Sequence, residues 1–137
     1  MELPFVDEHC QQLHGSVDVT WTSLLHVLRR QMAGSTALAR VLGCDPAEGT
    51  ARFSGLPGDT VPGFRVIEAE GRRLTLRGRH RFAIYDLTFV LDGSSLCART
   101  HAAFPGILGR LYRIVVIKTG AHRLITRHLL RRVASKT

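Results

Sequence analysis

Residues 64–104 read FRVIEAEGRRLTLRGRHRFAIYDLTFVLDGSSLCARTHAAF, and this stretch decides the fold class. The segments EGR at 70–72 and DGSS at 92–95 are typical of tight hairpin turns. Between these turns, apolar and polar residues alternate with the period of two that a half-buried strand requires. The stretch therefore predicts an antiparallel meander with strands at 64–69, 73–77, 81–91 and 96–104.

The longest predicted strand, 81–91, has two distinct faces. Tyr85 and Phe89 share one face with other apolar residues, whereas Asp86 lies on the other face. In the next strand, Thr100 and His101 likewise fall on opposite faces. Because a shift of one residue in the pairing reverses both faces, the sequence leaves open which face points inward.

Other elements are predicted before the meander. The alternation in 16–20 favours a strand, and apolar residues at three- and four-residue steps favour a helix over 21–32. A second short helix follows and is ended by Gly43, and residues 51–54 favour another short strand. Residues 1–14 are expected to form an N-terminal extension.

After the meander, residues 106–134 have the pattern of one long amphipathic helix. Gly120 lies inside this helix, so we expect it either to kink the helix or to permit a close approach there. The apolar side of the predicted helix carries Ile107, Leu108, Leu111, Ile114, Val115, Ile125, Leu129 and Val133.

Length and composition define the broad class. A chain of 137 residues can bury one hydrophobic core, so we expect a single domain over 1–137. With 45% hydrophobic residues, the chain is not of the disordered class. The sequence shows no signal peptide and no apolar run long enough to span a bilayer, so we expect a cytoplasmic protein without a transmembrane segment.

The cysteines, Cys10, Cys44 and Cys97, are odd in number and widely spaced. We therefore expect no disulfide framework and a reducing compartment. Because no cluster of cysteine and histidine has the spacing of zinc ligands, we expect no metal site, and no motif implies a cofactor.

Basic residues are concentrated late in the chain. The formal net charge is +8, and from Gly93 to Thr137 there are nine Lys or Arg residues and no acid. An anionic membrane or nucleic acid could bind such a face through Arg123, Arg127 and Arg131. No nucleic-acid-binding motif is present, so nucleic acid is not the expected partner, and a solvated basic face is the simpler interpretation.

The predicted order of elements resembles that of the SRPBCC superfamily, the START-like helix-grip fold of polyketide cyclases and lipid-transfer domains. The resemblance covers essentially the whole chain and rests on this order, on the phrase RFAIYDLTF at 81–89 and on THAAFPG at 100–106. It implies an α+β fold. A curved antiparallel sheet of about six to seven strands would wrap around the long C-terminal helix, with two short helices after the first strand.

The resemblance also implies a cavity between the sheet and the C-terminal helix that binds an apolar or aromatic small molecule or a lipid. An enzyme of the cyclase or dehydratase kind, using His101, His122 or Tyr85, is the alternative, although no catalytic motif defines the superfamily. The sequence also leaves a homodimer open. Candidate lining residues are Trp21, Leu25, Phe64, Tyr85, Phe89, His101, Tyr112, Thr119 and His122.

Three of these candidates have a purely structural interpretation as well. His122 falls on the apolar side of the predicted helix, where its imidazole is either satisfied by a strand backbone or faces a ligand. Tyr85 and Tyr112 have spacings that also suit a plain hydrophobic core.

Overall fold

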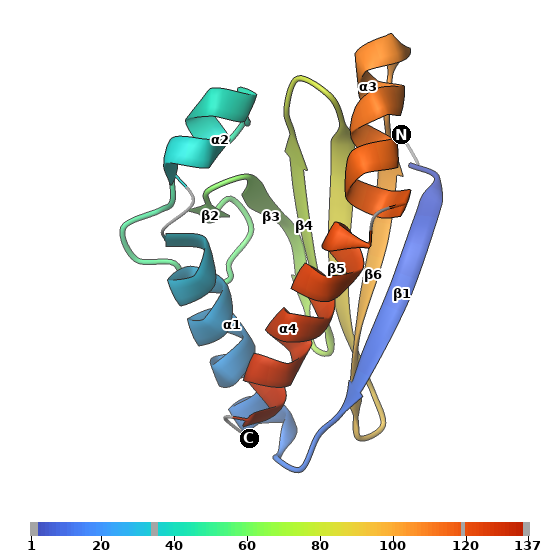
Figure 1. Ribbon diagram of the computed structural model, residues 1–137. Helices are drawn as coiled ribbons and strands as arrows, with labels where there is room; N and C mark the ends of the chain where they lie inside the picture. The colour runs from blue at the N-terminus through green and yellow to red at the C-terminus, as the bar shows by residue number, and fades with distance from the viewer. Residues whose placement is uncertain (1–2, 34–35, 119, 136–137) are drawn as a thin grey trace.

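A curved, six-stranded antiparallel sheet forms one layer of the protein, and the helices pack in front of one of its faces (Figure 1). The computed structural model describes residues 3–33, 36–118 and 120–135. The strands are β1 (Phe5–Gln12), β2 (Thr60–Val61), β3 (Phe64–Glu70), β4 (Arg73–Arg79), β5 (Ile84–Asp92) and β6 (Ser95–Ala103). The helices are α1 (Val17–Ala33), α2 (Thr36–Leu42), α3 (Gly106–Arg113), the π-helical segment η1 (Ile114–Lys118) and α4 (Ala121–Ser135).

The predicted meander is confirmed. Strands β3 to β6 are neighbours in chain order, and the full order across the sheet is β1-β6-β5-β4-β3-β2. Both predicted hairpin turns join the strands as expected. The predicted strand at 51–54 is wrong, because these residues form a turn and loop in which Phe53 enters the core; the short β2 lies further on.

The first strand lies earlier in the chain than predicted. Residues 1–14 were expected to be an extension, yet β1 within them pairs with β6 at the edge of the sheet. The expected strand at 16–20 is wrong, because those residues start α1. Ser16 explains this, since its Oγ accepts a hydrogen bond from the backbone N–H of Val19 (3.3 Å) at the helix start. The largely polar sequence of β1 hides it from a hydropathy pattern.

The register decides which face of the sheet points inward. Phe89 pairs with Ala98 in the neighbouring strand, and both are fully buried in the core under the helices. Tyr85 lies four residues away on the same face, whereas His101 pairs with Asp86 on the outer face. Leu24 of α1 and Leu130 of α4 complete this core from the helical side. Burying one such side chain contributes about 1.5–3 kcal/mol.

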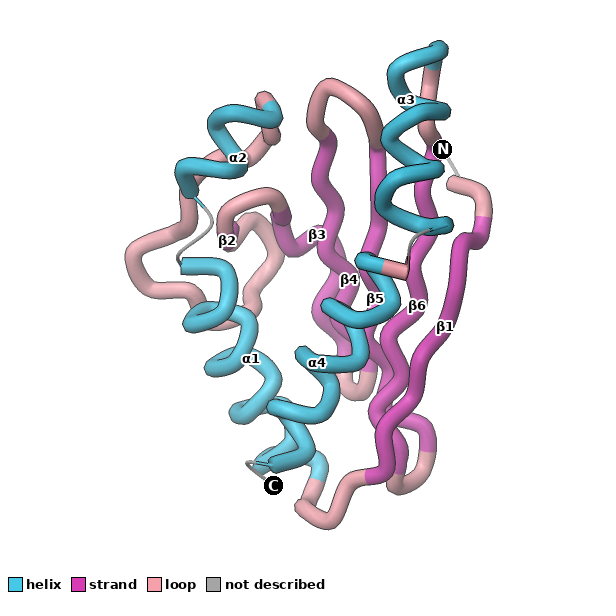
Figure 2. Tube along the Cα trace, viewed as in Figure 1, coloured by secondary structure: helices cyan, strands magenta, loops and turns pink. Residues whose placement is uncertain are grey.

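The predicted single C-terminal helix over 106–134 is wrong. It is divided into α3, η1 and α4: α3 continues directly into η1, and α4 then runs at an angle to them across the sheet (Figure 2). Gly120 has φ +81°, a left-handed conformation that glycine adopts at little cost. Its N–H donates to the carbonyl of Ile117 (3.1 Å), and α4 begins directly after it. None of the helices within the described ranges is long and apolar enough to cross a membrane.

A disulfide joins Cys10 and Cys97, contrary to the expectation from cysteine spacing. The two residues are 87 apart in the sequence but are direct partners in the β1–β6 ladder. Cys44 is a free thiol. Because Cys10 and Cys97 are paired, the cysteines of this chain no longer indicate a reducing compartment.

Candidate functional site

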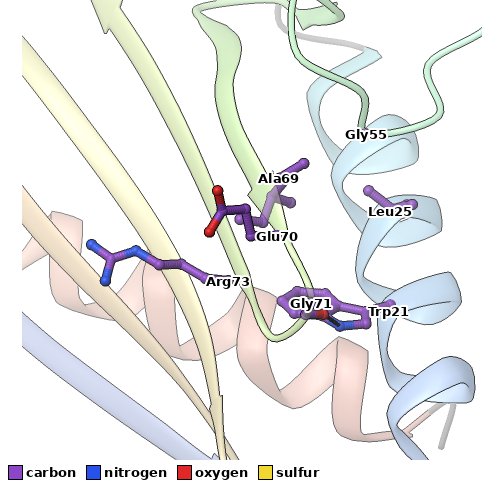
Figure 3. A pocket seen from close by; sticks show the side chains of 8 residues that line it. Trp21, Leu25, Gly55, Ala69, Glu70, Gly71 and Arg73 are labelled. Carbon is purple, nitrogen blue, oxygen red and sulfur yellow. Dashed lines mark hydrogen bonds between the residues drawn. The ribbon is translucent and has the colours of Figure 1, made fainter.

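A pocket of about 190 Å³ lies between α1 and the hairpin that joins β3 to β4 (Figure 3). Two of the predicted lining residues, Trp21 and Leu25, form its α1 side. The complete lining is Trp21, Leu25, Gly55, Ala69, Glu70, Gly71, Arg73 and Leu74.

Local geometry positions the walls of this pocket. Trp21 and Leu25 are four residues apart and therefore share one face of α1. The indole N–H of Trp21 donates to the carbonyl oxygen of Gly71 (2.6 Å), which ties the ring to the hairpin turn. Across the pocket, Gly55 lies so close to Leu25 that a Cβ would stand 2.5 Å from its Cδ2. A side chain at that position would push into the pocket wall.

Charged groups stay at the rim. Arg73 forms an ion pair with Glu68 (2.8 Å), and its side chain extends away from Trp21 in Figure 3. Glu70 also lines the pocket, and in Figure 3 its side chain extends away from Trp21 as that of Arg73 does. The walls nearest the indole ring are then Leu25, Ala69 and Leu74, which are apolar. This arrangement can accept an apolar group and leave a polar end of a ligand near solvent.

Aromatic rings gather at a second place, where α3 meets the sheet. His80 stacks edge-on against Tyr112 (4.8 Å between ring centroids) and contacts Tyr85 (5.5 Å). Phe82 stacks on Tyr112 (5.4 Å), and Phe64 contacts Tyr85 (5.1 Å). The predicted residues Phe64, Tyr85 and Tyr112 therefore belong to one aromatic cluster.

The polar groups of this cluster are held neutral. Burial raises the pKa of Tyr85 far above its usual range, and it also raises the pKa values of Tyr112 and Cys44. The Tyr85 hydroxyl donates to the carbonyl of Gly63 (2.7 Å). Gly78 permits this close packing, since a Cβ there would lie 1.9 Å from the same carbonyl oxygen. Tyr85 is thus satisfied by the protein itself and acts as core.

Acidification is expected to destabilise the protein through His80. Burial lowers the pKa of His80, and its Nδ1 accepts the Phe82 N–H (3.0 Å), which a protonated Nδ1 cannot do. Since the pKa is lower in the folded chain, the unfolded chain takes up the proton first as the pH falls. This contribution to stability is therefore complete above the ordinary histidine pKa and is lost progressively below it.

Thermal unfolding at pH values of about 7 and 5 checks this expectation. The melting temperature of the His80→Gln variant should depend less on pH than that of the wild type. His14→Gln, at an exposed histidine, is the control and should keep the wild-type dependence. Equal pH dependence in His80→Gln and the wild type would contradict the assignment.

A third polar group includes the predicted residue His122. Its Nε2 lies 3.1 Å from Thr100 Oγ1 and 3.3 Å from Asp7 Oδ1. The other oxygen of the same carboxylate lies 3.2 Å from His9 Nε2. One carboxylate of β1 thus contacts two imidazoles, and its contact with His122 joins β1 to α4.

A polar pocket of about 360 Å³ adjoins this group, between β1 and α4. Arg127 and Arg131 stand one helical turn apart on its α4 side, opposite His9 and Gln11. This pocket between α4 and the edge of the sheet is therefore polar, whereas the pocket beside α1 is apolar.

One set of side chains in the described residues brings metal-ligand atoms within 4.8 Å of one another: Glu8, Cys10 and Cys97. Both sulfurs belong to the disulfide, so neither is a thiolate that could bind a metal. The Glu8 carboxylate is paired with Arg99 instead.

Of the remaining predicted residues, Phe89 and His101 do not lie together in one site. Phe89 is completely buried core, and His101 lies on the outer face against Phe5 (5.6 Å between ring centroids). Thr119 lies outside the described residues. The sequence reasoning missed His80 and Asp7. His80 directly follows β4 and lies five residues before Tyr85, so its proximity to Tyr85 could be predicted from local sequence. The place of Asp7 could be recognised only once β1 was paired with β6.

Comparison with known proteins supports the fold and does not identify a family. No protein-family model and no curated protein matches this sequence. Among solved structures, the chain is similar to protein CV1439 from Chromobacterium violaceum, with a TM-score of 0.55 and 15% identity over 96% of each chain. The Mll3558 protein from Rhizobium loti has a TM-score of 0.49 and 15% identity, covering 95% of this chain and 92% of that chain. Both are structural-genomics targets, and at this identity the likeness to CV1439 supports the α+β fold alone.

Proposed function

We propose that the protein binds an apolar or aromatic small molecule, or one end of a lipid, in the pocket beside Trp21. The observation that carries this is the set of apolar walls around an indole ring held in place by Gly71. Apolar walls supply affinity, and a polar end of the ligand stays near solvent at the mouth of the pocket. The α+β architecture also agrees with our proposal that the fold is a helix-grip of the SRPBCC kind.

The pocket volume limits the ligand. At about 190 Å³, it is smaller than the roughly 300–1,000 Å³ of pockets that enclose a drug-sized molecule. We therefore propose that it holds a single ring or a short acyl segment while the rest of the ligand stays outside.

An enzyme of the cyclase or dehydratase kind has less support. Its proposed residues are spread over three places: His101 on the outer face, Tyr85 in the aromatic cluster and His122 beside Asp7. General acid–base chemistry needs such groups within reach of one reacting atom. Binding is thus the better supported function.

Filling the pocket is expected to weaken binding strongly. Trp21 is the single tryptophan, so its emission reports on this pocket directly. We expect oleate and 1-anilinonaphthalene-8-sulfonate to alter that emission with saturation. Ala69→Phe should weaken binding about tenfold or more, because the ring occupies the pocket, and a strand position tolerates it.

Two further variants serve as controls for this experiment. Ala69→Ser keeps the pocket and should bind within about twofold of the wild type. Leu111→Ser, on the exposed side of α3, should also leave the Trp21 titration unchanged. Unaltered binding by Ala69→Phe, or loss of the signal in Leu111→Ser, would show that the probe binds elsewhere and reject the proposal.

A further inference from the structure

The apolar side of α3 faces away from the protein. Gly109 is buried against the chain, where a Cβ would stand 2.7 Å from the carbonyl carbon of Phe104. Tyr112 packs on the same side, stacked on Phe82. Since successive residues turn by about 100°, the apolar residues at 107, 108 and 111 lie on the opposite side. The sequence pattern had predicted that they face the sheet, and the close approach at Gly109 reverses this.

These exposed residues form a continuous patch, the α3 stripe. Its members and their exposed fractions are Ile107 (78%), Leu108 (65%), Leu111 (53%) and Ile114 (48%). Single exposed apolar residues are ordinary, but several on one helix arc mark an interaction site. The short helix α2 lies at the same end of the molecule (Figure 1) and also exposes Leu38 and Val41.

The charge beside the stripe indicates the kind of partner. Arg110 is exposed on the same helix, and no ion pair among the described residues involves it. The chain from Gly93 onward has nine basic residues and no acid. A partner must therefore offer both apolar volume and negative charge.

We propose that α3 docks on the surface of an anionic lipid bilayer, with the α3 stripe inserted at the interface and Arg110 beside the headgroups. An apolar helix face flanked by arginine is what such an interface binds. A second copy of the chain would bring the same arginines against each other, which disfavours a symmetric dimer through this face. The inference goes beyond the proposed function, because docking does not require the Trp21 pocket to be filled.

Vesicle co-sedimentation with the full chain tests the proposal. Vesicles of phosphatidylcholine and phosphatidylglycerol in equal parts should bind the protein, and vesicles of phosphatidylcholine alone should bind it much less. Added salt should weaken binding, because it screens the arginines. Leu108→Ser/Leu111→Ser should reduce binding about tenfold or more, since two inserted side chains are lost. Arg110→Glu should reduce it as well.

Matched controls come from other surfaces. Leu56→Ser removes a leucine that is 62% exposed in a loop, and Arg65→Glu makes the same charge change at an exposed strand position. Both should bind as the wild type does, and circular dichroism should show that all variants fold. Absent or lipid-independent binding would overturn the proposal. A second result would also overturn it. In that case light scattering shows a wild-type dimer, and Leu108→Ser/Leu111→Ser converts it to a monomer while vesicle binding stays unchanged.

Discussion

Reduction of the Cys10–Cys97 disulfide is expected to lower the free energy of unfolding by about 4–5 kcal/mol. The bond closes a loop of 87 residues, and cross-linking a loop of this length removes much of the conformational entropy of the unfolded chain. It also ties the edge strand β1 to β6, so its loss should loosen the strand that carries Asp7. Denaturant unfolding with and without a reductant measures the change.

The free cysteine provides the control for this prediction. Cys10→Ser/Cys97→Ser should unfold at the same denaturant concentration with and without reductant, close to the reduced wild type. Cys44→Ser should retain the effect of the reductant, because Cys44 takes no part in the bond. Two results together would disprove the bond: three free thiols in the wild-type protein unfolded without reductant, and an unfolding midpoint that reductant does not change.

Replacement of Phe89 by alanine is expected to cost about 3–5 kcal/mol of folding free energy. Phe89 is fully buried on the inner face of β5, in the same core cluster as Leu24 of α1 and Leu130 of α4, and its removal leaves a cavity in that core. The sequence had placed this residue among the candidate ligand contacts. A core role predicts a loss of stability with little direct effect on binding at the Trp21 pocket.

Phe5→Ala is the matched control, since Phe5 is 60% exposed at the edge of the sheet. This variant should lose less than about 1 kcal/mol. A Phe89→Ala variant as stable as Phe5→Ala, but unable to bind oleate, would show that Phe89 lines a ligand cavity instead. Urea unfolding and the Trp21 titration distinguish the two outcomes.

The central meander was predictable because its signals are local. The turn at 70–72 and the alternation in β4 and β5 lie within a few residues of one another, so propensity and pattern suffice to identify them. The edge strand β1 was not predictable in this way. Its polar residues follow no core pattern, and its partner β6 lies more than 80 residues away.

The candidate sites depended even more on distant contacts. Trp21 and Leu25 were predicted from helix periodicity, but the groups that complete their pocket come from a hairpin about 50 residues later. His122 was predicted as a polar residue on an apolar side. Its partner Asp7 became visible only once β1 was paired with β6.

Local patterns in the sequence were enough to predict the strands and turns of the meander, the helical character of residues 21–32 and much of the C-terminal segment, and the concentration of positive charge after Asp92. These follow from the periodicity and turn chemistry of neighbouring residues. The inward face of the sheet, the Cys10–Cys97 bond and the outward side of α3 became visible only in the folded chain. They depend on register, on cross-strand pairing and on the close approach at Gly109, which are contacts between residues distant in sequence or between separate elements.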